Sequence, residues 1–457
     1  MMQDIFGQDT TLTTAQALDH WNRTQLAFLA HGASTPTHLA ETLTAEPDFV
    51  LGHTVKAMFY ILLGRKELLD TAQAAFAAAE AAQSKAPASK RERYFLLALR
   101  DWMKGHPRAA LHHFEAALAD NPTDTLAMKL DHAVRFVLGD NLGMRRMVEQ
   151  VLPAYSNAHP GYGYLLGCHA FTLEETGDYA RAQIAGREGL LLAPDDAWGL
   201  HAVAHVHDMT ADAAGGIKWL TGREEAWAHC NNFRYHVWWH KALMHLDLGD
   251  IDVVLDLYDR QIRQDKTDDY RDISNATSLL SRLELDGVNV GDRWEELADL
   301  SANRTEDGCL IFADLHYLLA LVGDHRDDAI AAMMGRLHRD ASAARTDMQK
   351  AMAAPGLAAA AGLEAFGEAD FETAFVNLAR ANAHLQAAGG SHAQRDVFER
   401  LTIDSGIRAG FLDEAEAFLD KRTNLRNGRI DGYAAARQKL IADGRRAAGA
   451  AARFAAL

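Results

Sequence analysis

The sequence predicts an all-helical protein made of stacked antiparallel helix pairs. Alanine, leucine and charged residues are abundant, only 9 prolines occur in 457 residues, and Val/Ile/Thr-rich runs bounded by turn residues are rare. A chain of this length could hold several compact domains or one elongated array. Turn glycines and prolines recur at fixed spacing, and this favours the array, because a stack of equal hairpins repeats its turn residues.

Two segments carry the repeat most clearly. In the first, "RERYFLLALRDWMKGHPRAALHHFEAALADNP", the recurring positions are Ala98, Gly105, Ala110, Phe114, Ala117 and Pro122. In the second, "YGYLLGCHAFTLEETGDYARAQIAGREGLLLAP", they are Ala170, Gly177, Tyr179, Ala182, Gly189 and Pro194. Both the turn glycines and the final prolines are 72 residues apart. Small residues let two helices approach, a glycine opens the turn and a proline ends the second helix. The pattern resembles the tetratricopeptide repeat.

The repeat register sets the expected order of the chain. The first helices of successive hairpins should begin at Arg91, Thr125, Gly163, Ala197, Tyr235 and Ile273, with turn glycines at Gly139, Gly249 and Gly287. Weaker copies precede and follow this block. Since one hairpin cannot bury its own apolar face, we expect a right-handed α-solenoid, which could curl into a closed superhelix.

Three regions follow from this register. Residues 1–80 form an N-terminal helical region with a degenerate repeat, and residues 91–308 hold the central repeats with a polar cluster. Residues 309–457 hold degenerate C-terminal repeats and a basic, alanine-rich terminal helix. The polar stretch 81–90 is a linker or a long turn.

The polar cluster combines "HAVAHVHDM", beginning at His201, with "HVWWH", beginning at His236. Residues four apart share a helix face, whereas His207 lies about 120° from His201 and should pack between helices. The resemblance to tetratricopeptide arrays implies which side chains line the concave groove. They are Trp198, His201, His205 and Asp208 in one repeat, His236 and Trp239 in the next with His240 at the edge, and Tyr164, Phe171, Glu174 and Glu175 in the repeat before.

Several chemistries fit these residues. His201, His205, His236 and His240 could hold a divalent metal such as zinc, with Asp208 adding an oxygen. The stretch "HAVAH" lacks the glutamate of HExxH, which disfavours a zincin-type protease, so a general base would be Glu175 or Asp208. Alternatively, without a metal ion, the same residues could act as general acid and general base.

Two further readings remain open. Tyr164, Trp198 and Trp239 could wall a pocket for an organic substrate, or the histidines could only hydrogen-bond one another and hold the repeats in register. The groove could also dock a peptide or protein, as in an adaptor. Adaptors expose Lys, Arg and Asn in the groove, and here only Lys129 and Asn275 fit that description.

Composition indicates which partners and which cellular compartment to expect. The net charge of −17 argues against nucleic acid as a partner. A basic n-region with an apolar core is absent at the N-terminus, and the best apolar run is interrupted by His53 and Lys56, so we expect no membrane association. Three scattered cysteines fit a reduced, cytoplasmic protein. The oligomeric state is left open by these patterns.

Longer blocks resemble one family along nearly the whole chain, the tetratricopeptide repeat protein 38 family. They are "DAWGLHAVAHVHDM", "YHVWWHKALMHLDLGD", "SLLSRLELDGVNVGDRW", "FADLHYLLALVG" and "GGSHAQRDVF". The resemblance implies family positions at His201, His205, His207, His236, His240, Trp198, Asp259, Asp314, His316, Arg395 and Asp396. It suggests that these polar blocks form one shared centre, with Arg395 and Asp396 reaching the substrate. The family name describes architecture and implies no reaction.

Taken together, these patterns predict a small-molecule pocket around the histidines and carboxylates. We expect binding of a small molecule, with hydrolytic or other acid/base processing, metal-assisted or not. The alternative is a non-catalytic adaptor.

Overall fold

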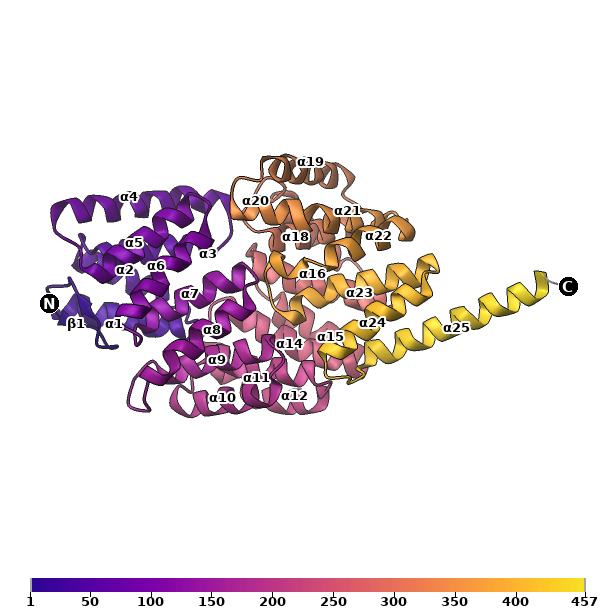
Figure 1. Cartoon of the computed structure of the whole chain (residues 1–457), viewed down its shortest axis with the longest axis horizontal. Helices are drawn as coiled ribbons and strands as arrows, with labels where there is room; N and C mark the ends of the chain where they lie inside the picture. The colour runs from indigo at the N-terminus through magenta and orange to yellow at the C-terminus, as the bar shows by residue number, and fades with distance from the viewer. Residues whose placement is uncertain (1, 456–457) are drawn as a thin grey trace. The chain divides into compact units, whose positions relative to one another are not determined.

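The computed structural model describes residues 2–455, and for 449–455 only the backbone is described. The predicted terminal helix therefore has its last residues, 456–457, outside the described part. Helices dominate the described chain (Figure 1), and the strands β1 (Met2–Gln3) and β2 (Asp9–Thr10) form one short antiparallel pair. The all-helical prediction is confirmed.

The chain divides into two compact units. The first comprises Met1–Val206, Thr221–Val237 and Arg345–Met348, and the second comprises His207–Leu220, Trp238–Ala344 and Gln349–Leu457. The helices up to the unit boundary are α1 (Ala15–Leu29), α2 (Thr35–Ala45), α3 (Val50–Leu62), α4 (Leu69–Lys85), α5 (Lys90–Met103), α6 (Pro107–Asp120), α7 (Thr125–Val137), α8 (Asn141–Val151), α9 (Tyr162–Glu175), α10 (Tyr179–Leu192) and α11 (Ala197–Met209). The predicted linker 81–90 is the end of α4, a short turn and the start of α5.

Fourteen further helices follow α11 in the described chain. They are α12 (Ala213–Leu220), α13 (Glu225–Ala228), α14 (Phe233–Leu248), α15 (Ile251–Leu257), α16 (Tyr270–Leu285), α17 (Arg293–Ala302), α18 (Ile311–Gly323), α19 (Asp327–Ala343), α20 (Asp347–Ala351), α21 (Leu357–Gly367), α22 (Phe371–Asn382), α23 (His392–Ala409), α24 (Leu412–Leu425) and α25 (Gly432–Ala455). Short 3₁₀ turns lie at Lys66–Leu68, Leu152–Ala154 and Leu385–Ala388, and single π turns at Tyr258–Ile262 and Met352–Gly356.

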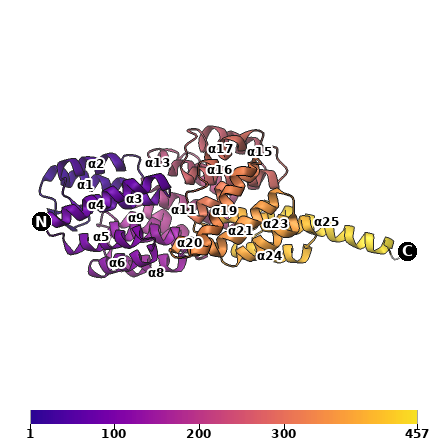
Figure 2. The same ribbon diagram turned by 90° about the horizontal axis from the view of Figure 1, so that it is seen from above.

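Sequential helices pack as hairpins, which confirms the tetratricopeptide-like solenoid. In the first unit, α1 packs on α2, α3 on α4, α5 on α6 and α9 on α10; in the second, α21 packs on α22 and α23 on α24. The two views show these pairs side by side, with α25 extending beyond α23 and α24 (Figures 1 and 2). Six predicted hairpin starts fall within three residues of helices α5, α7, α9, α11, α14 and α16.

Local chemistry explains where the helices begin and end. Ser89 and Glu92 form a capping box at the start of α5, and the Asp124 carboxylate accepts the Ala127 N–H at the start of α7. After α9, Gly177 has a φ of +83°, and the N–H groups of Gly177 and Asp178 donate to the last carbonyls of the helix. A residue with a Cβ would be strained at this turn.

Small residues set the distance between α9 and α10. A Cβ added at Gly163 would lie 2.9 Å from the Gly189 carbonyl oxygen, and one added at Gly189 would lie 2.8 Å from the Gly163 oxygen. The two backbones therefore touch, as the repeat pattern predicts. This packing holds α9, which carries Glu174 and Glu175, against its neighbours.

The described helices include none long and apolar enough to cross a bilayer.

Candidate functional site

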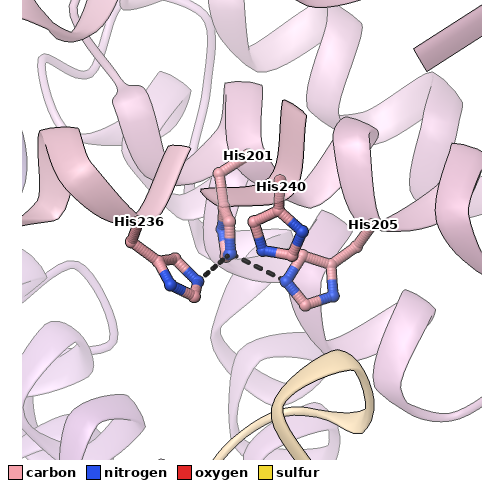
Figure 3. A group of neighbouring side chains, drawn as sticks. All are labelled: His201, His205, His236 and His240. Atoms are coloured by element: carbon pink, nitrogen blue, oxygen red, sulfur yellow. Dashed lines mark hydrogen bonds between the residues drawn. The ribbon is translucent and has the colours of Figure 1, made fainter. Parts of the chain in front are cut away.

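Four histidines bring their ring nitrogens together. His201 and His205 lie one turn apart on α11, and His236 and His240 lie one turn apart on α14. Each offers one nitrogen, and these four atoms lie within 4.8 Å of one another (Figure 3). All four side chains are buried. The i, i+4 spacing read from the sequence thus places two adjacent ligands on each of two helices.

The nitrogens of the first three histidines are in direct contact. The Nε2 atom of His201 lies 2.8 Å from Nε2 of His205 and 3.1 Å from Nε2 of His236. A neutral imidazole nitrogen has either one N–H or one lone pair, so His201 Nε2 cannot satisfy both neighbours equally. A cation among the three nitrogens would accept a lone pair from each.

The electrostatic setting keeps the His201 ring neutral. Burial lowers the pKa of His201 well below its ordinary value, and the nearby His205 and His236 lower it further. Neutral imidazole is the form that binds metal ions. His201 is therefore in the form that a metal ion would bind at neutral pH.

The donor set fits a divalent transition metal. Tetrahedral zinc with Zn–N bonds of about 2.0–2.1 Å places its nitrogen ligands roughly 3.4 Å apart. The Nε2 contacts of 2.8 and 3.1 Å are slightly shorter than this, so small side-chain rotations would open the required space. Nitrogen-rich sites suit zinc, copper, nickel and iron better than magnesium or calcium.

Two buried carboxylates complete the neighbourhood of His205. An oxygen of Glu174 lies 3.4 Å from His205 Nδ1, and Glu174, Glu175 and His205 together form a second group of potential ligands. A carboxylate beside Nδ1 favours the tautomer with its proton on Nδ1, the tautomer whose Nε2 has a lone pair for a metal ion. Glu175 also accepts a hydrogen bond from the Asn141 amide at 2.7 Å.

Aromatic rings cover His201. Trp198 lies 5.0 Å from it between ring centroids, Phe171 stacks on it at 5.9 Å, and the Phe233 edge faces it at 5.1 Å. Trp198 therefore lies beside the histidines, where the sequence predicts a pocket wall.

The other predicted wall residues lie in different surroundings. Tyr164 packs with Phe6 and Leu29 and donates to Asp195 at 2.9 Å. Trp239 is a core residue of the second unit, edge-on to His240 at 4.8 Å with Arg282 over its indole. Their size and apolar area make them packing residues there.

Asp208 is not one of the described carboxylates grouped with the histidines. It lines a small pocket of the second unit with Asp247, Asp396, Arg400 and Asp431. Asp208 shares the azimuth of His201 but lies one turn farther along α11 than His205. Glu174, which helical spacing puts in the predicted groove without indicating a role, is the carboxylate that lies beside His205.

Asp396 is held by arginines. It accepts from Arg422 Nε at 2.6 Å and Arg400 Nε at 2.7 Å, and Arg426 approaches to 3.3 Å. Burial by itself would raise the pKa of Asp396, but Arg422, Arg400 and Arg426 hold it well below the ordinary value. The expected single polar centre is thus two sets of residues with different partners, the histidine group and the Asp208–Asp396 pocket.

Arg395, predicted beside Asp396 as a substrate contact, is directed at the backbone. Its guanidinium donates to the carbonyls of Gly389 and Gly390, in the glycine turn before α23. It therefore holds this turn against the helix start.

Three minor expectations can also be placed. His207 pairs with Asp212 at 2.9 Å. Asp259 is half exposed and pairs with Arg293, as expected of a surface acid. Of the other two family positions, Asp314 binds Arg336 at 2.7 Å, and the His316 ring contacts the Phe312 carbonyl.

The solved structures that this chain resembles share little of its sequence. No family model matches the chain. A human IFIT1 dimer with m7Gppp-AAAA is 13% identical with a TM-score of 0.40, covering 93% of this chain and 95% of that chain. A human IFIT1 dimer with PPP-AAAA is 13% identical with a TM-score of 0.41, covering 97% of each.

These structures correct one expectation. The two IFIT1 structures are described with m7Gppp-AAAA and with PPP-AAAA, and the expectation that nucleic acid is no partner is not kept. The physical reason is that net charge is a sum over the whole surface, whereas phosphate binding depends on local groups of cations.

Proposed function

We propose that the chain is a member of the tetratricopeptide repeat protein 38 family whose His201, His205, His236 and His240 bind one divalent metal ion. Zinc is the first candidate, and the metal serves the acid/base processing, hydrolytic in the simplest case, of a small organic molecule. The observation that carries the proposal is the convergence of four buried histidine nitrogens within 4.8 Å.

Burial makes a group of neighbouring polar rings costly, and a shared ligand would lower that cost. Polar side chains lose water on burial and need partners, and here two Nε2 contacts compete for one nitrogen of His201. A divalent cation held there would supply Lewis acidity to a substrate oxygen. Structural packing alone would be served as well by apolar residues of similar size.

The surrounding residues would have distinct tasks. Glu174 orients His205 through Nδ1. Glu175, the carboxylate in the same group of potential ligands, is placed to accept or return a proton. Trp198 offers an indole face beside His201 against which an organic substrate could pack.

Elemental analysis of protein purified without a His tag tests the proposal. We expect about one equivalent of metal per chain in the wild type and loss of it in a His201→Ala/His205→Ala variant. A matched control is His38→Ala, because His20, His38 and Glu41 form another possible ligand group that is partly exposed. That variant should keep its metal.

Activity is tested separately. A screen for depletion of metabolites by the metal-loaded wild type, with the double variant as the blank, would identify a substrate. A wild type that binds no transition metal after incubation with zinc would overturn the metal site. Peptide or protein binding that is unchanged in the folded double variant would instead support an adaptor.

A further inference from the structure

A second group of polar side chains lies within the first unit, around Trp198. Lys129 and His132 lie three residues apart on α7 and so share a helix face. The Lys129 ammonium lies 5.0 Å from the Trp198 ring centroid, and the His132 ring meets Trp198 edge-on at 5.7 Å. All three side chains are at least 92% buried.

The described residues offer these side chains few hydrogen-bond partners. The Lys129 ammonium has one hydrogen-bond contact, the weak acceptor Cys168 Sγ at 3.9 Å, and no carboxylate oxygen lies within 4.0 Å of it. Neither ring nitrogen of His132 has a partner, nor does the indole N–H of Trp198. A buried ammonium without a counter-ion is one of the most costly arrangements in a folded protein.

Asp196, an acid that interacts electrostatically with Lys129, is engaged elsewhere. Asp196 accepts the Gly199 N–H at 3.1 Å, which caps the start of α11. Burial raises the pKa of Asp196 to about 7, although Lys129 partly offsets this. At neutral pH the Asp196 carboxyl is therefore only partly ionised, and the charge of Lys129 is incompletely balanced.

The geometry points to a binding site for the carboxylate of a small molecule, held by Lys129, His132 and the Trp198 indole N–H. A carboxylate brings one negative charge for one ammonium and two oxygens for the remaining donors. Burial and Lys129 hold the pKa of His132 well below its ordinary value, so the ring adds a neutral donor and no second charge.

This inference goes beyond the proposed metal site, because none of its three donors belongs to the histidine group. Phe171 contacts both His132 and His201, so the two sites share an aromatic neighbour. A substrate held by its carboxylate at Lys129 could extend past Trp198 toward His201. A carboxylic acid, an N-acyl amino acid or a similar acidic molecule is therefore the expected ligand class.

The test uses thermal unfolding of the full chain in sodium acetate against sodium chloride at equal ionic strength. A ligand that binds the folded state raises the midpoint by mass action. We expect acetate to raise the midpoint of the wild type, and Lys129→Met to abolish this rise. We also expect Lys129→Met to be more stable than the wild type without acetate, because the substitution removes a buried, unbalanced charge and keeps the side-chain length.

The control is Lys241→Met. Lys241 makes the same kind of contact, 5.1 Å from the Trp238 ring centroid, but at a half-buried position. It should keep the acetate response. A second variant, Trp198→Phe, retains the ring and removes only the N–H, and should reduce the response.

Other outcomes are equally informative. A wild type whose midpoint is the same in acetate and chloride would overturn the site, as would a Lys129→Met protein that responds to acetate like the wild type. A rise of the midpoint in inorganic phosphate but not in acetate would mean that the site binds phosphate rather than carboxylate groups. That result would also overturn the proposal. The metal content of the same samples is measured independently, so failure of one site does not imply failure of the other.

Discussion

Replacing Asp396 by asparagine separates a structural role from the substrate contact suggested by the sequence. Asn keeps the size of the side chain and one oxygen but removes the negative charge. The Asp396 side chain is 5% exposed and faces Arg422, Arg400 and Arg426 at 2.6–3.3 Å. The Asp396→Asn variant leaves these guanidinium groups buried around a neutral amide.

The expected loss of stability is large. Removing one member of a buried ion pair costs about 3–5 kcal/mol, because the remaining charge stays buried without compensation. Asp431 still pairs with Arg422 at 2.7 Å, which places the expected loss at the lower end, about 3 kcal/mol. Asp259→Asn is the matched control, since Asp259 makes a similar paired contact to Arg293 at a half-exposed site. Exposed pairs contribute about 0–1 kcal/mol.

Urea unfolding followed by circular dichroism measures both variants. We expect Asp396→Asn to lower the midpoint strongly at an unchanged slope, and Asp259→Asn to have little effect. The pH dependence has a definite sign. The folded pKa of Asp396 is depressed, so its stabilisation is present above the ordinary Asp pKa of about 3.9 and is lost only as pH falls below that value. Equal midpoints for Asp396→Asn and the wild type at pH 7 would refute the argument.

Two further predictions concern the first unit. Glu174→Gln should weaken metal affinity about 10–100-fold while leaving the stoichiometry unchanged, measured by competition with a chromogenic chelator; unchanged affinity would mean that Glu174 does not orient His205. Asp196 has a raised folded pKa of about 7, so ionising it opposes folding, and its contribution to stability falls as pH rises from about 4 towards 7. Asp196→Asn should therefore gain thermal stability relative to the wild type between these values, and a constant difference across the range would contradict the assignment.

Much of the fold could be read directly from the sequence. Turn glycines at positive φ, such as Gly105 and Gly177, and small residues at helix contacts, such as Gly189, are requirements of the local backbone. They repeat with the hairpin, so the register placed six helix starts within three residues. The pairing of His201 with His205 and of His236 with His240 is likewise a matter of helical spacing.

The partners of these residues were harder to predict. Helical azimuth grouped Asp208 with His201 and His205, yet Asp208 lies in a pocket with Asp396, and Glu174 meets His205 instead. The azimuth of a residue predicts the helix face on which its side chain lies. It does not predict at which height along the helix axis a neighbouring helix contacts that face. The Asp314–Arg336 and Asp396–Arg422 pairs carry no local signal, because their members lie 22 or more residues apart in the sequence. Arg400, four residues after Asp396, is the exception.

The sequence by itself determined the helical class, the repeat register and the two histidine pairs, because each depends on spacing within one helix or one hairpin. Only the tertiary structure decided which carboxylate lies beside the histidines, that Asp396 lies among arginines, and that Lys129 and His132 are buried beside Trp198. These depend on the docking of separate helices, where a shift of one turn, about 5.4 Å, exchanges one set of neighbours for another.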